Sequence, residues 1–375
     1  MILTQCACCA APLPHLAKQC SRCKTRCCGP ACQAQHWKEG GHDKCCKQIR
    51  KGGGAEQYYA NMKYATAVAA AVEKCAADTK GQTCYICMEG NTKESLVRGC
   101  ACHTTEGFVH VSCLAEQAKI LVAEAVENKM DLTGRHASWG RWYKCGLCEQ
   151  EYHGEVYCAL GWACWKTYLG RPERAWTRQS AMQQLGNGLY EVKCHEEELS
   201  VRQAELSMLR RLGVSGQHML AGQGNLANTH QALGRFEESL QLTRDVHSGF
   251  LKLKGEEHSN TLLAARKYAA SLIELQRFKE ARALLRKTMH MARRVLGERN
   301  DLLLRMRRSY AEALDKDPSA TLGDLREAVN TMEDTERIAR RVLGDAHPTM
   351  EDLEHYLRES RAVLSSREHR WGNFF

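Results

Sequence analysis

The sequence predicts a multidomain protein, in which two small cysteine-rich domains precede an all-α solenoid of repeated helical pairs. Two observations predict this division. Of the 21 cysteines, 20 lie in the first 164 residues, and the last 181 residues contain none. The cysteine-free part is rich in Ala, Leu, Glu and Arg, which favour helices, and it repeats with a period of 42 residues. A chain of 375 residues is long enough for several domains.

Composition and charge narrow the classes of function. Nowhere does the chain have the roughly 18 consecutive apolar residues of a membrane-spanning helix, and its first residues lack the pattern of a secretory signal. We therefore expect a cytoplasmic and/or nuclear protein without a membrane anchor. Residues 1–50 carry eight Lys or Arg against two acidic residues. This bias could attract nucleic acid, but a solvated finger surface is the more common explanation.

The first cysteine-rich segment, residues 1–50, has the ligand spacing of a double zinc site. Zinc prefers four thiolate or imidazole ligands, and each C-x-x-C turn supplies two of them. So short a segment buries too little apolar surface to fold alone, and metal binding would contribute about 10 kcal/mol per site. The eight candidate ligands are Cys6, Cys9, Cys20, Cys23, Cys28, Cys32, His42 and Cys46.

This segment resembles the MYND zinc finger. The resemblance lies in the run Cys28-Gly-Pro-Ala-Cys32-Gln33-Ala-Gln-His36-Trp37, which is followed by His42 and Cys46. The resemblance implies a cross-brace: Cys6, Cys9, Cys28 and Cys32 hold one zinc ion, and Cys20, Cys23, His42 and Cys46 hold the other. It also implies that Gln33 and Trp37 shape a peptide-binding groove. The adjacent pairs Cys8/Cys9, Cys27/Cys28 and Cys45/Cys46 leave one alternate ligand open, and we favour the surplus thiols as small buried hydrophobic side chains.

Residues 51–83 are predicted to form a helical linker. The run Gly52-Gly53-Gly54 predicts a flexible break. A helix over residues 55–77 follows, with Tyr58, Met62, Ala65, Ala69 and Val72 near one stripe.

A second ligand series occupies residues 84–150. It consists of Cys84, Cys87, Cys100, Cys102, His110, Cys113, Cys145 and Cys148. The C4-H-C3 order, with GCACHTTEGFVHVSCL in its middle, resembles the RING-CH finger of ubiquitin ligases. The resemblance implies one zinc ion on Cys84, Cys87, His110 and Cys113, and another on Cys100, Cys102, Cys145 and Cys148. Four zinc ions are thus expected in the whole chain.

A RING-type ligase forms no covalent intermediate; it positions a ubiquitin-charged conjugating enzyme for attack. The resemblance places that docking surface on Ile86, on Trp139 or Trp142, and on Leu147. Two features depart from the family: 31 residues separate Cys113 from Cys145, and Glu149 stands where many relatives have a cation. Two interpretations of this finger therefore have equal weight, because fold does not dictate function. It is either a ubiquitin-protein ligase or a zinc-stabilised interaction module without catalysis.

Residues 151–180 are predicted to be a helical connector, and residues 181–365 the solenoid. Gly213, Gly255 and Gly297 are spaced by 42 residues, and Gly344 follows after 47. Arg235-Phe236 and Arg277-Phe278 mark equivalent turns between helices. This pattern resembles kinesin-light-chain-type tetratricopeptide repeats, which implies protein or peptide partners.

Within the repeats, the resemblance implies that Asn225 grips the backbone of a bound peptide. Residues 256–297 carry nine Lys or Arg against four Glu. These cations indicate either a groove for acidic peptides or, as we favour, a solvated convex face. Residues 366–375 are expected to form a flexible tail.

Overall fold

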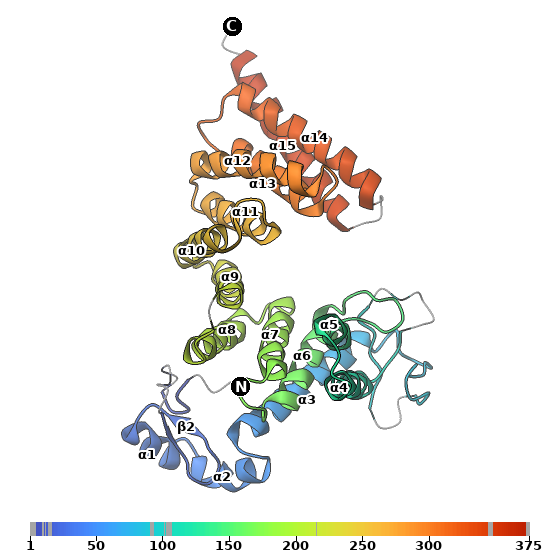
Figure 1. Ribbon diagram of the computed structural model, residues 1–375, viewed down its shortest axis with the longest axis vertical. Coiled ribbons are helices and arrows are strands. Elements are labelled where there is room, and N and C mark those ends of the chain that lie inside the picture. Colours follow the sequence, from blue (N-terminus) through green and yellow to red (C-terminus); the bar gives the residue numbers. More distant parts are fainter. Residues whose placement is uncertain are drawn as a thin grey trace. The chain divides into compact units, whose positions relative to one another are not determined.

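The computed structural model describes residues 5–9, 11, 13, 17–90, 94–100, 102, 107–214, 216–343 and 348–372. It divides into two compact units, residues 1–213 and 214–375, which we call unit 1 and unit 2. Figure 1 shows that both units are mainly helical and that strands occur only in the first cysteine-rich segment of the described chain. Over the described ranges, no helix combines the length and apolarity needed to cross a membrane.

Unit 1 begins with a small finger of two short strands and two helices. The strands β1 (Lys18–Gln19) and β2 (Arg26–Cys27) are antiparallel. They precede α1 (Pro30–Lys38) and α2 (His42–Lys51), and Pro30 at the start of α1 occupies a position where its missing N–H is not needed. The core of the finger is small, and among its described residues Ile49 is the one large side chain that is fully buried.

The glycine run after α2 is an ordered turn, not the flexible break that the sequence predicts. Gly53 and Gly54 have φ angles of 89° and 94°, which favour glycine. The N–H of Gly54 donates to the carbonyl of Ile49 at 3.0 Å. The N–H of Ala55 donates to the carbonyl of Cys23 at 2.8 Å, so the start of the next helix is fixed to the finger.

That next helix, α3 (Ala55–Cys75), buries a different face from the predicted one. Its buried residues are Ala55, Ala60, Ala67, Ala71 and Cys75. Met62 of the predicted stripe is half exposed. An alanine-rich helix is weakly apolar on every side, so periodicity alone cannot select the buried face.

The rest of unit 1 surrounds α6. The remaining elements are α4 (Val111–Glu127), α5 (Leu132–Trp139), the 3₁₀ turn η1 (Gly140–Trp142), α6 (Gly154–Tyr168), α7 (Trp176–Glu191) and α8 (His195–Arg211). Helix α6 packs against α3, α4 and α7. Gly188 permits the close approach of α7, because a Cβ atom there would lie 2.9 Å from the Cα of Cys158. The predicted linker, finger and connector thus share one core with the start of the predicted solenoid.

Unit 2 contains seven helices in its described residues. They are α9 (Gln217–Ala232), α10 (Phe236–Lys254), α11 (Ser259–Glu274), α12 (Phe278–Leu296), α13 (Asp301–Asp315), α14 (Leu322–Leu343) and α15 (Pro348–Gly372). Phe236 and Phe278 each begin a helix, as their shared motif predicts. Gly255 and Gly297, with φ of 83° and 82°, end the helices before them.

Two predictions concern the end of unit 2. Gly344, the fourth repeat-ending glycine, lies outside the described residues. Helix α15 continues to Gly372, so the segment from residue 366, predicted as a flexible tail, starts as helix.

Unit 2 has an inner and an outer layer of helices. Helices α11, α13 and α15 contact one another across successive repeats, in addition to contacting their own partners. In a curved stack, the layer whose successive helices stand closer together lies on the inner side. We therefore call α11, α13 and α15 the inner layer, and α10, α12 and α14 the outer layer.

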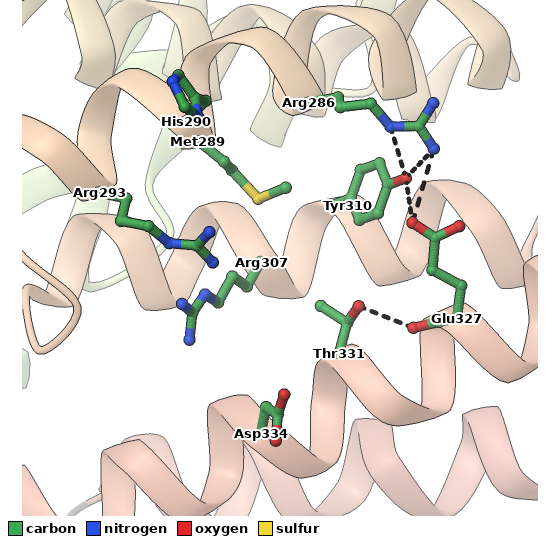
Figure 2. Close-up of a pocket in the computed structure, with 9 residues that line it drawn as sticks. All are labelled: Arg286, Met289, His290, Arg293, Arg307, Tyr310, Glu327, Thr331 and Asp334. Atoms are coloured by element: carbon green, nitrogen blue, oxygen red, sulfur yellow. Dashed lines mark hydrogen bonds and ion pairs between the residues drawn. The ribbon is translucent and has the colours of Figure 1, made fainter.

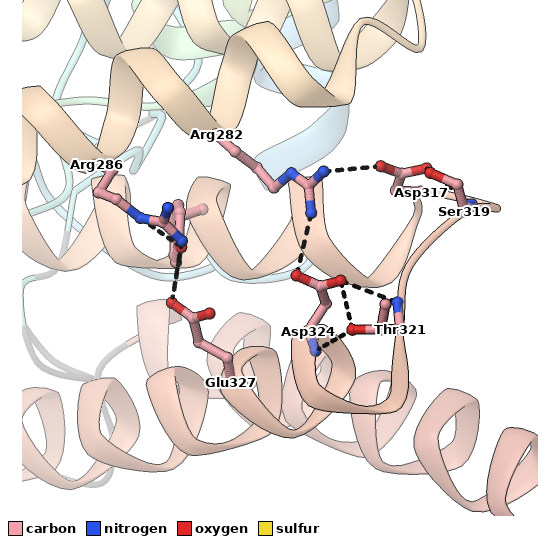
Figure 3. Close-up of polar contacts among 8 residues, drawn as sticks. Arg282, Arg286, Asp317, Ser319, Thr321, Asp324 and Glu327 are labelled. Atoms are coloured by element: carbon pink, nitrogen blue, oxygen red, sulfur yellow. Dashed lines mark hydrogen bonds and ion pairs between the residues drawn. The ribbon is translucent and has the colours of Figure 1, made fainter.

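A network around Arg282 fixes the loop between α13 and α14. Arg282 on α12 donates to Asp317 at 3.2 Å and to Asp324 at 3.3 Å (Figure 3). Asp324 also accepts from the N–H of Thr321 at 2.9 Å, and Thr321 Oγ1 accepts from the N–H of Asp324. This reciprocal pair begins α14, and Arg282 holds the loop of residues 316–321 against α12.

Candidate metal centres

Four groups of cysteine and histidine lie in unit 1, and each could hold a zinc ion. The ligand atoms within each group are all less than 4.8 Å apart. The groups are Cys6, Cys9, Cys28 and Cys32; Cys20, Cys23, His42 and Cys46; Cys84, Cys87, His110 and Cys113; and Cys100, Cys102, Cys145 and Cys148. They comprise the sixteen predicted ligands, in the interlaced order implied by the two cross-braces.

The distances within the groups fit tetrahedral zinc. With Zn–S bonds of about 2.3 Å, two sulfur ligands at tetrahedral positions are about 3.8 Å apart. The Sγ atoms of Cys9 and Cys28 are 3.7 Å apart, those of Cys20 and Cys46 3.8 Å, and those of Cys102 and Cys145 3.7 Å.

Histidine completes two of the groups through different ring nitrogens. Nε2 of His42 lies 3.3 Å from Sγ of Cys23. Nδ1 of His110 lies 3.4 Å from Sγ of Cys87, and its Nε2 lies 3.1 Å from the carbonyl oxygen of Gly90. Such a contact to the second nitrogen fixes the tautomer and the ring orientation of a metal-binding histidine.

The first cysteine of four C-x-x-C turns, one in each group, is readily ionised. Burial opposes ionisation of Cys6, Cys20 and Cys84, but hydrogen bonds outweigh it and lower the pKa to about 6, 6 and 7. Backbone N–H groups of the turns are donors in all three cases. For Cys145 the hydrogen bond with the Cys100 thiol is the largest cause, and the pKa is lowered to about 4. Thiolate is the form that binds metal.

Other thiols in the same groups are held protonated. Burial first, and the neighbouring thiols next, raise the pKa of Cys46 and of Cys113 to about 12. The hydrogen bond with Cys145 and burial raise the pKa of Cys100 well above its usual range. Several thiolates this close together repel one another, and a divalent cation removes that repulsion. The donor set therefore fits zinc.

The surplus cysteines have other surroundings. Cys27 is buried, and burial raises its pKa to about 11. Cys45 Sγ donates to the carbonyl of His42 at 3.6 Å, and Cys8 Sγ to Oε1 of Gln35 at 3.4 Å. In α6, Cys158 and Cys164 are buried core residues.

The tips of two metal-binding turns present apolar side chains. The N–H groups of Ile86 and Leu147 each donate to the first cysteine of their turn at 3.4 Å. Leu147 is 48% exposed, and Ile86 is partly buried. The turns are neighbours, because Tyr85 Oη would lie 3.8 Å from a Cβ atom at Gly146.

Trp139 and Trp142, the two tryptophans predicted for the docking surface, pack against other aromatic side chains of unit 1 instead. Trp142 is 0% exposed, so it belongs to the core and the prediction that it docks a partner is corrected. Trp139 is partly buried and packs on Trp142, Tyr168 and Trp176. Sequence spacing could not reveal this, because the partners Tyr168 and Trp176 lie beyond the finger.

Glu149, the acidic residue after the last ligand, is paired. Arg141 Nη2 donates to its Oε1 at 2.7 Å, and Nη1 of Arg141 donates to the carbonyl of Cys145 at 3.0 Å. The hydrogen bond from Arg141 lowers the pKa of Glu149. The pair joins η1 to the last metal-binding turn, a contact that the sequence analysis missed.

The remaining candidate partner-binding residues lie on helix surfaces. In the first finger, Trp37 of α1 is 39% exposed and Gln33 is partly buried. The ring of Trp37 packs at a tilt against that of His42, with centroids 5.3 Å apart. Asn225 is partly buried on α9.

Most cations of residues 256–297 belong to ion pairs of the outer layer. Those paired with carboxylates are Arg277, Arg282, Arg286, Lys287, Arg293 and Arg294. Helices α12, α13 and α14 line a cavity of about 350 Å³. Figure 2 shows Arg286 at this cavity, in contact with Tyr310 and Glu327. Five of these six cations are exposed, as a solvated face predicts, whereas Arg282 is only 18% exposed and belongs to the network described above.

Comparisons with known proteins identify two modules. Residues 84–126 match the family model of the RING-variant domain, and residues 218–293 match that of the tetratricopeptide repeat. No curated protein matches the chain. The chain is also similar to a solved structure of kinesin-light-chain TPR-like repeats from Podospora anserina, with 18% identity, a TM-score of 0.42, and coverage of 62% of this chain and 97% of the other. A structure of BtubC from P. vanneervenii shares 10% identity over 69% of this chain and 92% of its own, with a TM-score of 0.38.

Proposed function

We propose that this protein is a zinc-dependent ubiquitin-protein ligase of the RING-CH type, in which the helical repeats bind the substrate. The observation that carries the proposal is the RING-variant finger with Ile86 and Leu147 at the tips of neighbouring metal-binding turns. Zinc would supply structural cross-links, and no step of the transfer would pass through it. The finger would hold a ubiquitin-charged conjugating enzyme, and the acceptor lysine of the bound substrate would attack its thioester.

Ubiquitin transfer with a panel of conjugating enzymes tests this proposal. We expect the purified full chain to build ubiquitin chains with at least one enzyme of the panel. Ile86→Ala should slow chain formation at least about fivefold, because a docking residue at the centre of an interface contributes more than about 1 kcal/mol. Met88→Ala is the matched control, since Met88 is exposed in the same finger but lies outside the tip pair.

Zinc content is measured on every sample, so that loss of activity is separated from loss of metal. A chain that holds four zinc ions and remains inert with the whole panel would contradict the ligase. Transfer that Ile86→Ala leaves unchanged would contradict the docking surface.

A non-catalytic adaptor is the second candidate, and one observation favours it. Glu149, paired with Arg141, places a carboxylate beside the last metal-binding turn, where many ligases have a free cation. An adaptor would capture protein partners through the repeats and the first finger without transferring ubiquitin.

The first finger supplies the peptide-binding surface of this second candidate. We propose that it is a MYND-type finger, because its candidate ligands follow the MYND order. In addition, Trp37 and Gln33 share one face of α1 at a spacing of four residues. Trp37→Ala should then abolish capture of peptide partners while leaving the zinc content unchanged.

A further inference from the structure

One guanidinium of the inner layer has a buried atom without an acceptor. Arg266 lies in the middle of α11, and its Nε atom is buried. Over the described ranges, no hydrogen-bond acceptor lies within reach of this atom. A buried charged donor without an acceptor costs free energy, so this Nε atom does not stabilise the fold through a hydrogen bond.

The next inner helix, α13, which packs against α11, carries Arg305 and Arg308. Burial is the largest cause that lowers the pKa of Arg266, and repulsion from Arg305 and Arg308 on α13 adds to it. Asp301 offsets part of this effect. Three guanidinium groups thus interact across the contact between α11 and α13.

The carboxylates nearby leave this cluster positive. Arg305 pairs with Asp301 at 2.8 Å. Arg308 lies 4.0 Å from Asp352 and stacks over the ring of Tyr356 on α15. Three arginines and two carboxylates sum to one positive charge, and among the described residues Arg266 is the arginine of the three without an ion pair. This distinguishes Arg266 from the six ion-paired cations of the outer layer described above.

An apolar side chain stands beside the arginines. Leu263 is 40% exposed and precedes Arg266 by three residues, which places both on one face of α11. The surface therefore suits a chain segment that carries an anionic group next to an apolar residue.

We propose that Arg266, with Arg305 and Arg308, binds the phosphoryl group of a phosphorylated serine or threonine on an extended segment of the substrate. The inference rests on the proposed function in one respect, that the repeats recruit the substrate. A phosphoryl group offers three acceptor oxygens and a charge of about −1.5 to −2 at pH 7. Carboxylates already accompany Arg305 and Arg308, so a ligand that competes for them must carry more charge than one carboxylate.

Binding of small probes to the full chain tests the proposal. The probes are N-acetyl-phosphoserine amide, N-acetyl-glutamate amide and N-acetyl-serine amide, and the readout is the arginine Nε–Hε NMR resonances. We expect the phosphorylated probe to shift the Arg266 resonance and to bind at least about tenfold more tightly than the glutamate probe. Equal affinity of these two probes would overturn the assignment to a phosphoryl group.

Variants separate this site from general electrostatic attraction. Arg266→Gln should lose binding of the phosphorylated probe, whereas Arg244→Gln, an exposed arginine of α10, should retain it. Unchanged binding by Arg266→Gln would refute the site. Arg266→Met should be at least as stable as the wild type, because it removes an unpartnered charge, and this excludes unfolding as the cause of lost binding.

The outcome is independent of ubiquitin transfer. A chain that binds the phosphorylated probe but transfers no ubiquitin retains this site and loses the ligase. A ligase that transfers ubiquitin but does not bind the probe retains its activity and loses this site.

Discussion

The rings of Trp139 and Trp176 pack edge to face, with centroids 5.3 Å apart and an angle of 64° between their planes. Trp139 ends α5, inside the long gap between the metal-binding turns of the second finger. Trp176 begins α7, well beyond the finger. Tyr168 of α6 contacts Trp139 as well, at 5.5 Å between centroids. The 31-residue gap that departs from the RING-CH pattern is therefore the segment that attaches the finger to the helices of unit 1.

Metal content is the first prediction. Native mass spectrometry of the purified chain should find four zinc ions, and Cys145→Ser should reduce this number to three and lower the melting temperature. Cys75→Ser is the control, since Cys75 is buried but bonds to the backbone of Arg98 and belongs to no metal group. Retention of four ions by Cys145→Ser would show that this cysteine is not a ligand.

The second prediction contrasts two apolar residues of the second finger. Trp142→Ala should destabilise the chain by about 3–5 kcal/mol, because it opens a cavity in the core. Leu147→Ala should change the free energy of unfolding by less than about 0.5 kcal/mol, since Leu147 is half exposed. Chemical denaturation measures both effects. Similar losses in the two variants would contradict the assignment of Trp142 to the core.

The third prediction concerns Arg282 and pH. Burial opposes ionisation of Asp317, but bonds from Ser319 and the charge of Arg282 outweigh it, and its pKa is lowered. Bonds from Thr321 are the largest cause that lowers the pKa of Asp324. A lowered pKa adds stability above the unfolded value, near 3.9, and this stability is lost as the pH falls through the folded value.

Arg282→Met should therefore lower the stability at pH 7 by about 1.5–3 kcal/mol and reduce the loss on acidification below about pH 4. Arg326→Met is the control, because its pair with Glu368 is exposed and should contribute less than about 1 kcal/mol. Urea denaturation at pH 7 and pH 3 provides the comparison. An unchanged pH dependence in Arg282→Met would contradict the role of this network.

The fourth prediction concerns Asp315, whose contribution to stability decreases as the pH rises. Burial raises the pKa of Asp315, at the end of α13, to about 6, although Ser360 donates a hydrogen bond to it at 2.5 Å. The protonated carboxyl stabilises the fold below the unfolded pKa of about 3.9, and this contribution is lost as the pH rises through about 6.

Asp315→Asn should thus be about 1–2 kcal/mol more stable than the wild type at pH 7.5, with the difference vanishing near pH 4. The amide oxygen can still accept from Ser360. Denaturation curves at the two pH values measure the difference, and Asp245→Asn, on the exposed surface of α10, is the control. A variant less stable than the wild type at pH 7.5 would refute this account.

Local signals were sufficient to predict how the candidate ligands group and where the helical turns lie. A C-x-x-C turn brings two sulfur atoms together within four residues, and its N–H groups favour the thiolate whatever surrounds it. Phe236, Phe278, Gly255 and Gly297 likewise act within one turn of helix. Such features depend on neighbours in sequence, and the structure places them where the sequence predicts.

Features that depend on residues far away in the chain could not be predicted from local sequence signals. The face that α3 buries depends on α6, which lies about 100 residues away in the chain. The burial of Trp142 depends on Tyr168.

The sequence alone determined the chemistry that this protein offers: sixteen side chains in four groups that could each hold a zinc ion, and helices that repeat every 42 residues. Only the tertiary structure decided which side chains remain available to partners. It buried Trp142, left Leu147 exposed, and separated Arg266 from the ion-paired cations of the same repeat. The physical reason is that ligand spacing and helix period are local properties, whereas solvent exposure and charge pairing depend on residues that only the fold brings together.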